Sequence, residues 1–303
     1  MKKVINFMGI RHVAFAVTVV LTLISLVSLA TKGLNFGLDF TGGTLIELSY
    51  QKPADQQQVK EQLVEAGYAD AVVQTFGATT DLLVRMPGDD PHLGNKVADA
   101  LLEADGDNPA TVKRVEFVGP AVGEELRDQG GLGMLLALGG ILLYVAFRFQ
   151  WKFGFGAIVS LIHDVIVTLG VFSFFEIPFD LTVLAAVLAI IGYSLNDTIV
   201  VFDRIRENFR VLRKTELIDN INISTTQTLL RTMATSISTL LAIVALMVFG
   251  GEPLWGFSLA LFIGVSAGTY SSVYIASILL IWLKLTTEDL IPPVASEEVD
   301  ERP

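Results

Sequence analysis

The sequence predicts a polytopic α-helical membrane protein with six transmembrane helices and, between helices 1 and 2, an extracytoplasmic α+β domain of ferredoxin-like (βαββαβ) order. Composition is the first observation: 52% of the 303 residues are hydrophobic, 17% are charged, and the mean hydropathy is +0.58. Ordinary soluble domains are less apolar than this. Clustering is the second, because the apolar residues form six runs close to or longer than the roughly 18 residues that cross a bilayer as helix.

The six apolar runs are expected to be helices because a helix satisfies its own backbone polar groups in lipid. Their expected bounds are 13–30, 132–147, 154–175, 181–202, 229–249 and 257–283. A cleaved signal peptide is the alternative for the first run, since Lys2 and Lys3 precede it and 28–30 loosely matches a cleavage site. The run is longer than the roughly 7–15 apolar residues of a signal peptide, which favours a retained helix.

Basic residues in the short connections predict the orientation, because loops rich in Lys and Arg stay in the cytoplasm. Arg148 and Lys152 flank one connection, and basic residues crowd the segment 203–214. The run 203–210 either extends the fourth span as an amphipathic helix on the membrane surface or serves only as topogenic charge. The connections 176–180 and 250–253 contain acidic residues and no basic one. Six spans then place both termini in the cytoplasm of a multi-pass protein of the bacterial inner membrane.

The segment 32–130 lies outside by this topology and is long enough to form a periplasmic domain. Its periodicity predicts strands at 44–50, 69–76, 79–86 and 111–118 and helices at 54–66 and 92–103. The simplest packing of this order is an antiparallel sheet with two helices on one face. Acidic residues outnumber basic ones here, so nucleic acid is not expected as a partner.

The other parts of the chain follow from the same boundaries. Residues 1–31 comprise a cytoplasmic N-terminus and the first helix, and residues 131–285 comprise helices 2–6 with a cytoplasmic loop at 203–228. The acidic cytoplasmic tail at 286–303 is expected to be disordered.

Four ionisable residues fall at membrane depth, where such side chains normally face the interior of a helix bundle. They are His163, Asp164, Asp197 and Arg231. Helical spacing puts them in three polar stripes: Ser160, Asp164 and Thr168; Ser194 and Asp197; and Gln227, Arg231, Thr235 and Ser238. The stripes predict one polar interior path that conducts protons or ions.

A static role is the alternative, in which these groups only hold helices together. Asp197 comes late in a span that runs inward and Arg231 early in a span that runs outward, so both are expected in the cytoplasmic third of the membrane, within reach of each other. His163 is a candidate proton carrier because imidazole titrates near neutral pH. A polar contact between helices is the equally good alternative for that residue.

No enzymatic centre, cofactor site or metal site is expected. The chain has no Cys, and its three histidines, His12, His92 and His163, fall in different regions. Residues 264–268 match the G-x-S-x-G pattern of serine hydrolases, but that pattern requires a strand-to-helix turn. Inside an apolar helix, Gly264 and Gly268 are instead expected to form a close helix-packing face.

Four short runs together resemble one protein family. They are GLDFTGG at 37–43, VEFVGPAVGEEL at 115–126, IGYSLNDTIVVFDRIRENFR at 191–210 and LRTMATS at 230–236. These runs are similar to the SecD/SecF family of the resistance-nodulation-division superfamily, and the similarity covers nearly the whole chain. The first run follows the first span, as in that family, and contributes the motif residues Gly37, Asp39, Gly42 and Gly43.

The resemblance implies a subunit that pairs with SecD, associates with the SecYEG channel and uses the proton motive force to help move exported proteins across the membrane. It also implies that Asp197, Arg231 and Thr235 belong to a proton pathway, with a further aspartate supplied by SecD. Ser194, His163 and Asp164 are weaker members, added from their positions in the stripes.

The outer domain is expected to bind rather than catalyse, with unfolded preprotein adding to an edge strand of its sheet. Two other functions remain as alternatives to protein export. One is a small-molecule or lipid exporter of the same superfamily, and the other is a purely structural scaffold for the translocon.

Overall fold

The computed structural model describes residues 4–76, 78–104, 108–212, 215–286 and 289 of the chain. Within this part the chain forms two compact units. The α+β unit comprises Phe36–Gly133 and Phe179–Leu181, and the helical unit comprises the described residues outside those two segments. Of the expected acidic tail only Thr286 and Asp289 are described; the rest lies outside the described residues, so its disorder stays a prediction.

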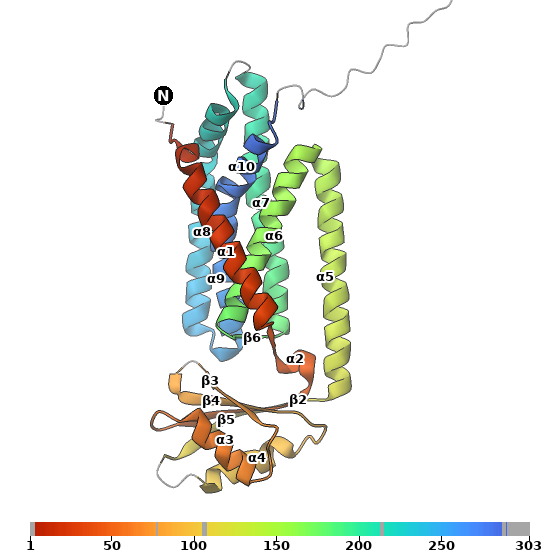
Figure 1. Ribbon diagram of the computed structural model, residues 1–303, viewed down its shortest axis with the longest axis vertical. Helices are drawn as coiled ribbons and strands as arrows, with labels where there is room; N and C mark the ends of the chain where they lie inside the picture. The colour runs from red at the N-terminus through yellow and green to blue at the C-terminus, as the bar shows by residue number, and fades with distance from the viewer. Residues whose placement is uncertain (1–3, 77, 105–107, 213–214, 287–288, 290–303) are drawn as a thin grey trace, which may run out of the picture. The chain divides into compact units, whose positions relative to one another are not determined.

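Long helices make up the helical unit (Figure 1). The short helix η1 (Phe7–Ile10) leads into α1 (Arg11–Thr31), and the later helices are α5 (Pro120–Arg148), α6 (Trp151–Phe174), α7 (Leu181–Val211), α8 (Leu217–Phe249), α9 (Glu252–Val273) and α10 (Ile275–Trp282). The first part of α5, up to Gly133, and the first residue of α7 belong to the α+β unit. Six helical segments of the described chain are long and apolar enough to cross a membrane, the sixth being α9 with α10. The predicted six helices are confirmed, and the chain is a multi-pass membrane protein.

Two helices extend well beyond the expected spans. α7 continues to Val211 and α8 begins at Leu217, so most of the expected connection at 203–228 is helical, and its place in the cytoplasm stays a prediction. Ile205 and Phe209 are buried on one face of the α7 extension. Burial of that face in the core of the helical unit stabilises helix past the end of the apolar run, so the helical continuation at 203–210 is confirmed, and its placement on the membrane surface stays a prediction.

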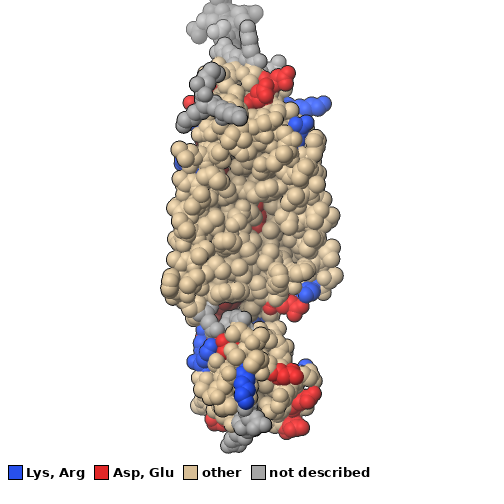
Figure 2. Space-filling view, turned by 90° about the vertical axis from the view of Figure 1, so that its left-hand side faces the viewer, with Lys and Arg blue, Asp and Glu red and all other residues tan. Residues whose placement is uncertain are grey.

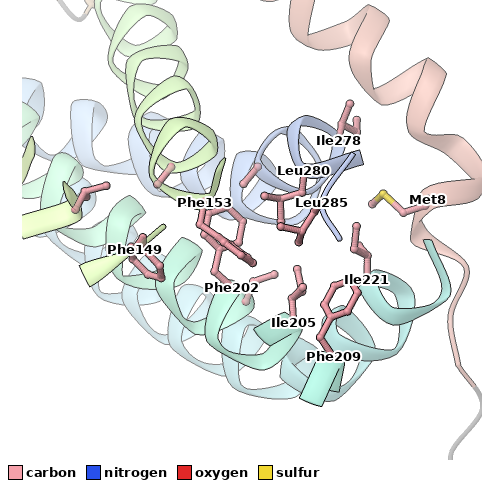
Figure 3. Packing of buried hydrophobic residues seen from close by; sticks show 14 of the residues in the cluster. Met8, Phe149, Phe153, Phe202, Ile205, Phe209, Ile221, Ile278, Leu280 and Leu285 are labelled. Atoms are coloured by element: carbon pink, nitrogen blue, oxygen red, sulfur yellow. The ribbon is translucent and has the colours of Figure 1, made fainter. Parts of the chain in front are cut away.

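Aromatic and aliphatic side chains fill the core of the helical unit (Figure 3). Phe153 of α6 and Phe202 of α7 are fully buried, and their rings meet edge to face with centroids 5.1 Å apart. Met8 joins this core, and its backbone N–H donates to Asn222 Oδ1 at 3.0 Å. Burial of each such side chain contributes about 1.5–3 kcal/mol, so the core and this hydrogen bond hold the N-terminal segment against α8.

Glycines let α9 approach α7 closely. A Cβ atom on Gly264 would come within 2.3 Å of Ile190, and one on Gly268 within 3.0 Å of Ser194. Only a residue without a side chain permits such an approach, which gains van der Waals contact between the helices. The expected packing face at Gly264 and Gly268 is therefore confirmed.

The α+β unit contains a four-stranded antiparallel sheet. Its strands are β2 (Gly43–Tyr50), β3 (Val72–Phe76), β4 (Ala78–Met86) and β5 (Ala110–Val118), and its longer helices are α3 (Gln56–Glu65) and α4 (Leu93–Ala104). The strand order is β3-β4-β2-β5, and β2 runs antiparallel to both β4 and β5. This order confirms the predicted ferredoxin-like βαββαβ fold. The short elements are α2 (Leu38–Thr41) and the paired strands β1 (Asn35–Phe36) and β6 (Pro178–Phe179).

Helices α3 and α4 cover one face of the sheet (Figure 1). The register pairs Ile46 with Val84 and Leu48 with Leu82, and all four side chains are fully buried in the core of this unit. Alternate residues of a strand point to the same face, so these four side chains lie together on the helix-covered face, and Leu45 and Leu83 are buried in a separate cluster. Leu63 of α3 packs into the core on the helix-covered face.

The opposite face of the sheet carries a polar cluster. Ser49 Oγ donates to Asp81 Oδ1 at 2.6 Å, and Lys113 Nζ donates to Asp81 Oδ2 at 3.1 Å. The Ser49 hydrogen bond lowers the pKa of Asp81 below its ordinary value; burial opposes this, and Lys113 adds to the lowering. Asp81 is therefore ionised at neutral pH and compensates the positive charge of Lys113.

The surface of the helical unit is apolar. Figure 2 shows a broad belt of this unit that is almost free of Lys, Arg, Asp and Glu on the face drawn there. Parts of two helices are strongly exposed: Phe147 of α5 is 84% exposed, and Leu230 and Phe249 of α8 are 77% and 87% exposed. Exposed apolar faces of this extent contact lipid or another protein.

Candidate functional site

Asp164 of α6 is the most deeply buried carboxylate of the described transmembrane helices, with no exposed surface. Its Oδ2 accepts hydrogen bonds from Ser194 Oγ of α7 at 2.5 Å and from Ser271 Oγ of α9 at 2.7 Å. Its Oδ1 lies 3.0 Å from Nδ1 of His163. A carboxylate that accepts several hydrogen bonds is stabilised in a buried site, and the bonds to Ser194 and Ser271 tie α6 to α7 and α9.

The stripe predicted on α6 lies in the interior of the bundle. Ser160, Asp164 and Thr168 recur at every fourth residue and are all fully buried. Thr168 Oγ1 donates back to the carbonyl oxygen of Asp164 at 2.8 Å, and Ser160 Oγ has no hydrogen-bond partner among the described residues. The stripe therefore supplies one acid and two hydroxyl groups, of which only the acid joins other helices by an observed hydrogen bond.

Asp197 lies on the same helix as Ser194 and is 5% exposed. Thr232 Oγ1 of α8 donates to Asp197 Oδ1 at 3.4 Å, which is long for a hydroxyl hydrogen bond. Asp197 Oδ2 is buried and has no hydrogen-bond partner among the described residues. A buried carboxylate with one long hydrogen bond is poorly compensated, in contrast to Asp164.

Arg231 and Thr235 lie on the exposed side of α8, whereas Thr232 is 1% exposed. Thr235 Oγ1 donates to the backbone carbonyl oxygens of Arg231 and Thr232 at 3.1 and 3.0 Å. Among the described residues no ion pair within 4.0 Å joins Arg231 to Asp197. The structure thus brings Asp197 to Thr232 rather than to Arg231 or Thr235, and the expected interior stripe on α8 faces outward in this chain.

Two residues of this site were not predicted from the sequence. Ser271 contacts Asp164, and Thr232 contacts Asp197. The only signal for Ser271 was a pair of serines, Ser271 and Ser272, inside the last apolar run. Thr232 adjoins Arg231 in the sequence, but successive side chains point about 100° apart around a helix. The prediction for Arg231 therefore did not extend to Thr232.

The glycine-rich segment at 37–43 has a structural role in the α+β unit. Gly42 and Gly43 have φ angles of +65° and +107°, and a Cβ on Gly43 would lie 2.4 Å from the carbonyl oxygen of Met86. Asp39 Oδ2 accepts the backbone N–H of Leu181 at 3.0 Å, and the N–H of Gly37 donates to the Phe179 oxygen at 2.8 Å. The motif thus binds the segment 179–181 through Gly37 and Asp39, and its two glycines with positive φ angles let the chain turn closely past Met86.

No three His, Cys, Asp or Glu side chains of the described residues gather closely enough to hold a metal ion. Ser266, the serine of the G-x-S-x-G pattern, lies within α9 and donates its Oγ to the backbone oxygen of Phe262 at 2.7 Å. That hydroxyl donates within its own helix. The pattern therefore lies in the middle of a helix and not at the strand-to-helix turn that a serine hydrolase requires.

Family models match most of the sequence. Residues 97–286 match the C-terminal region of the protein export membrane proteins SecD/SecF, and residues 27–54 match the SecD/SecF GG motif. The second match covers the glycines described above.

Relatives of similar length carry the same description. The protein translocase subunit SecF of Pseudomonas aeruginosa is 73% identical over 299 residues, which cover 99% of this chain and 98% of the relative. The subunits of Vibrio alginolyticus and Escherichia coli O157:H7 are 48% and 44% identical, over 98% and 95% of their lengths and the whole of this chain.

Solved structures show the same fold. The crystal structure of SecDF from Thermus thermophilus, a translocon-associated membrane protein, is 40% identical with a TM-score of 0.84 over 93% of this chain. A crystal structure of SecDF in a super-membrane-facing form gives a TM-score of 0.68 over 94% of this chain. In both cases this chain spans only 39% of the SecDF chain.

Proposed function

The chain belongs to the SecD/SecF family of protein-export membrane proteins, and we propose that it acts as the SecF-type subunit that uses the proton motive force to promote protein translocation. The observation that supports the coupling is the burial of Asp197 in a transmembrane helix, where its carboxylate has one long hydrogen bond within the part of the chain that the structure describes. A carboxylate that is poorly compensated within the membrane is costly to retain and typically belongs to an ion or proton pathway.

The proposed pathway combines Asp197 with Arg231 and Thr235, and has Ser194, His163 and Asp164 as its weaker members. When α8 rotates or shifts, the carboxylate of Asp197 loses its hydrogen bond from Thr232 and pairs with the guanidinium of Arg231 instead. A nearby cation favours an ionised carboxylate, and its withdrawal favours a protonated one, so alternation between the two arrangements loads and releases a proton. The proton gradient then changes the relative populations of two conformations of the helix bundle.

A SecD-type partner fits the uncovered faces of the helical unit. Leu230 and Phe249 of α8 and Phe147 of α5 are strongly exposed, and Arg231 lies on the same exposed side of α8. An arginine facing lipid within the membrane is unfavourable, whereas a partner helix that offers an acidic side chain would pair with it. We therefore assign a carboxylate of the partner to the pathway. We also propose that the complex of the two subunits acts on the SecYEG channel.

We place the protein in the bacterial inner membrane with both termini in the cytoplasm and the α+β unit in the periplasm, because the basic connections stay inside. A reporter fused after Gly94 should be active in the periplasm, and one fused after Arg213 only in the cytoplasm. Alkaline phosphatase and green fluorescent protein fusions measure the two sides. Cytoplasmic activity after Gly94 would reverse the orientation and refute the periplasmic assignment.

The α+β unit is proposed to bind unfolded preprotein and to have no enzymatic activity. Strands β3 and β5 stand at the two ends of the strand order, and the free edge of such a strand can pair with an extended chain. A photo-crosslinker at Thr111 on β5 should therefore capture a preprotein arrested late in export, whereas one at Glu61 on α3 serves as the control. Equal capture at both positions would contradict edge-strand binding.

Export measurements in vesicles test the function as a whole. Vesicles that contain SecYEG, a SecD-type partner and this chain should export preprotein faster when a proton gradient is imposed, and a sodium gradient of equal size should have no effect. Omission of this chain is the control. Normal assembly without any gradient effect would favour a structural scaffold, and gradient-driven release of lipid or small molecules without export would favour an exporter.

A further inference from the structure

A charged crevice of about 400 Å³ lies beside the C-terminal end of α5 and the extension of α7, both within the helical unit. Three arginines, two acidic residues and one valine line it: Arg148 of α5, and Asp203, Arg206, Glu207, Arg210 and Val211 of α7. The charged residues of α7 recur at spacings of three and four, so they share one face of the helix. That face points away from the buried side chains of Ile205 and Phe209.

Asp203 compensates only one of the arginines well. Its Oδ2 pairs with Nη2 of Arg148, while its Oδ1 lies 3.4 Å from Nη1 of Arg206. The second distance is long for a charge-assisted hydrogen bond. A guanidinium has five N–H donors, so Arg206 retains donors for a further acceptor.

The other acidic residue of the crevice is paired elsewhere. Glu207 Oε2 lies 3.0 Å from Nη1 of Arg204, which is not among the lining residues. Arg210 is exposed, and no ion pair within 4.0 Å joins it to any residue that the structure describes. The crevice thus has an excess of positive charge, and the occupant that complements it is an anion.

The crevice lies at the level of the lipid headgroups. The apolar run of α7 ends at Phe202, and a rise of about 1.5 Å per residue puts Arg206 and Arg210 about 6 and 12 Å beyond it. The headgroup layer is roughly 5–8 Å thick on each side of a bilayer, which the long side chain of Arg210 can reach. Trp151, the first residue of α6, is 66% exposed, and exposed Trp is typical of the membrane–water interface.

Exposed apolar side chains continue from the crevice into the membrane. Leu143 and Phe147 lie one turn apart on α5 and are 59% and 84% exposed. A soluble anion would use only the arginines, whereas a phospholipid has both a phosphate and acyl chains. We propose that the crevice binds an anionic phospholipid such as phosphatidylglycerol, whose phosphate accepts hydrogen bonds from Arg206 and Arg210 and whose acyl chains lie along Leu143 and Phe147. The inference requires only that the chain spans a membrane and does not depend on proton coupling.

Two lipids with the same acyl chains test the site on the full chain in detergent. Phosphatidylglycerol and phosphatidylcholine both contain a phosphate, but only phosphatidylglycerol has a net charge. Native mass spectrometry resolves the bound lipids by mass, and each lipid is titrated separately. Phosphatidylglycerol should bind about tenfold more tightly, because no ammonium group of its own competes for its phosphate. Inorganic phosphate in excess should not displace it, and displacement would show that the site takes a free anion instead.

Variants that change one charge each assign the contact. Arg210→Gln should weaken the binding of phosphatidylglycerol about fivefold or more and leave that of phosphatidylcholine unchanged. Lys32→Gln is the matched control, because it also removes an exposed positive charge, which pairs with Glu176 at 2.8 Å beyond the other end of α1. Glu207→Gln removes a negative charge from the crevice and frees Arg204, so it should strengthen the binding about two- to fivefold.

Three outcomes would overturn the proposal. The first is equal affinity of the unmodified chain for the two lipids. The second is an unchanged affinity for phosphatidylglycerol in Arg210→Gln or in Glu207→Gln. The third is an equal loss in Lys32→Gln, which would show a response to net charge alone. Arg210 and Glu207 are both exposed, so either variant decides if the other does not fold.

Discussion

Asp197→Asn is expected to reduce the rate of preprotein export to the value measured without a gradient, while the subunit still assembles with its partners. Asparagine keeps the size of the side chain and can still accept the 3.4 Å hydrogen bond from Thr232, but it cannot take up or release a proton. The whole gradient-stimulated part of export should therefore be lost. Export rate against imposed proton gradient in vesicles measures this.

The same substitution at an exposed position provides the control. Asp219 lies exposed in the first turn of α8, so Asp219→Asn should leave the gradient response unchanged. Arg231→Lys should be defective, because an ammonium group cannot reproduce the planar donor fork of the guanidinium. Thr235→Ala should have a milder effect, since its hydroxyl bonds only to its own helix in this structure. A normally assembled Asp197→Asn complex with a full gradient response would remove Asp197 from the mechanism.

Gly43→Ala should destabilise the α+β unit by about 3 kcal/mol or more, because two costs add. The φ angle of +107° is unfavourable for any residue with a Cβ atom, and that atom would lie 2.4 Å from the carbonyl oxygen of Met86 on the neighbouring strand. Relief of this overlap requires β2 and β4 to separate at the pair Thr44–Met86. Hydrogen exchange of the β2 and β4 amides in the full chain measures the loss.

Gly67→Ala is the matched control in the same unit. Gly67 has a φ angle of +92°, but nothing lies within 4 Å of a Cβ atom placed there. Its substitution should therefore cost only the backbone term of about 1–2 kcal/mol. Equal losses for the two variants would show that the contact with Met86 contributes nothing and that only the dihedral angle matters.

Local properties of the sequence were enough to predict both units. A transmembrane span depends on the length and hydropathy of one continuous run, and each of the six runs coincides, to within one residue at its end, with part of a helical segment that meets that criterion. The βαββαβ order followed from periods of two and 3.6 residues, because alternate residues of a strand, and every third or fourth residue of a helix, lie on the same face. The burial of Asp197 was also predictable, since an ionisable side chain in an apolar run turns away from lipid.

The partners of the buried acids could not be predicted in this way. Periodicity fixes which residues of α8 share a face, but the rotation of the helix about its axis depends on what packs against it. α8 turns Thr232 and Ser236 inward and leaves Arg231 and Thr235 on its exposed side, so Asp197 meets Thr232. Likewise, Ser271 reaches Asp164 only because α9 crosses α6 and α7 at that level. Contacts between distant segments are set by the packing of whole helices, and no single segment of the sequence contains that information.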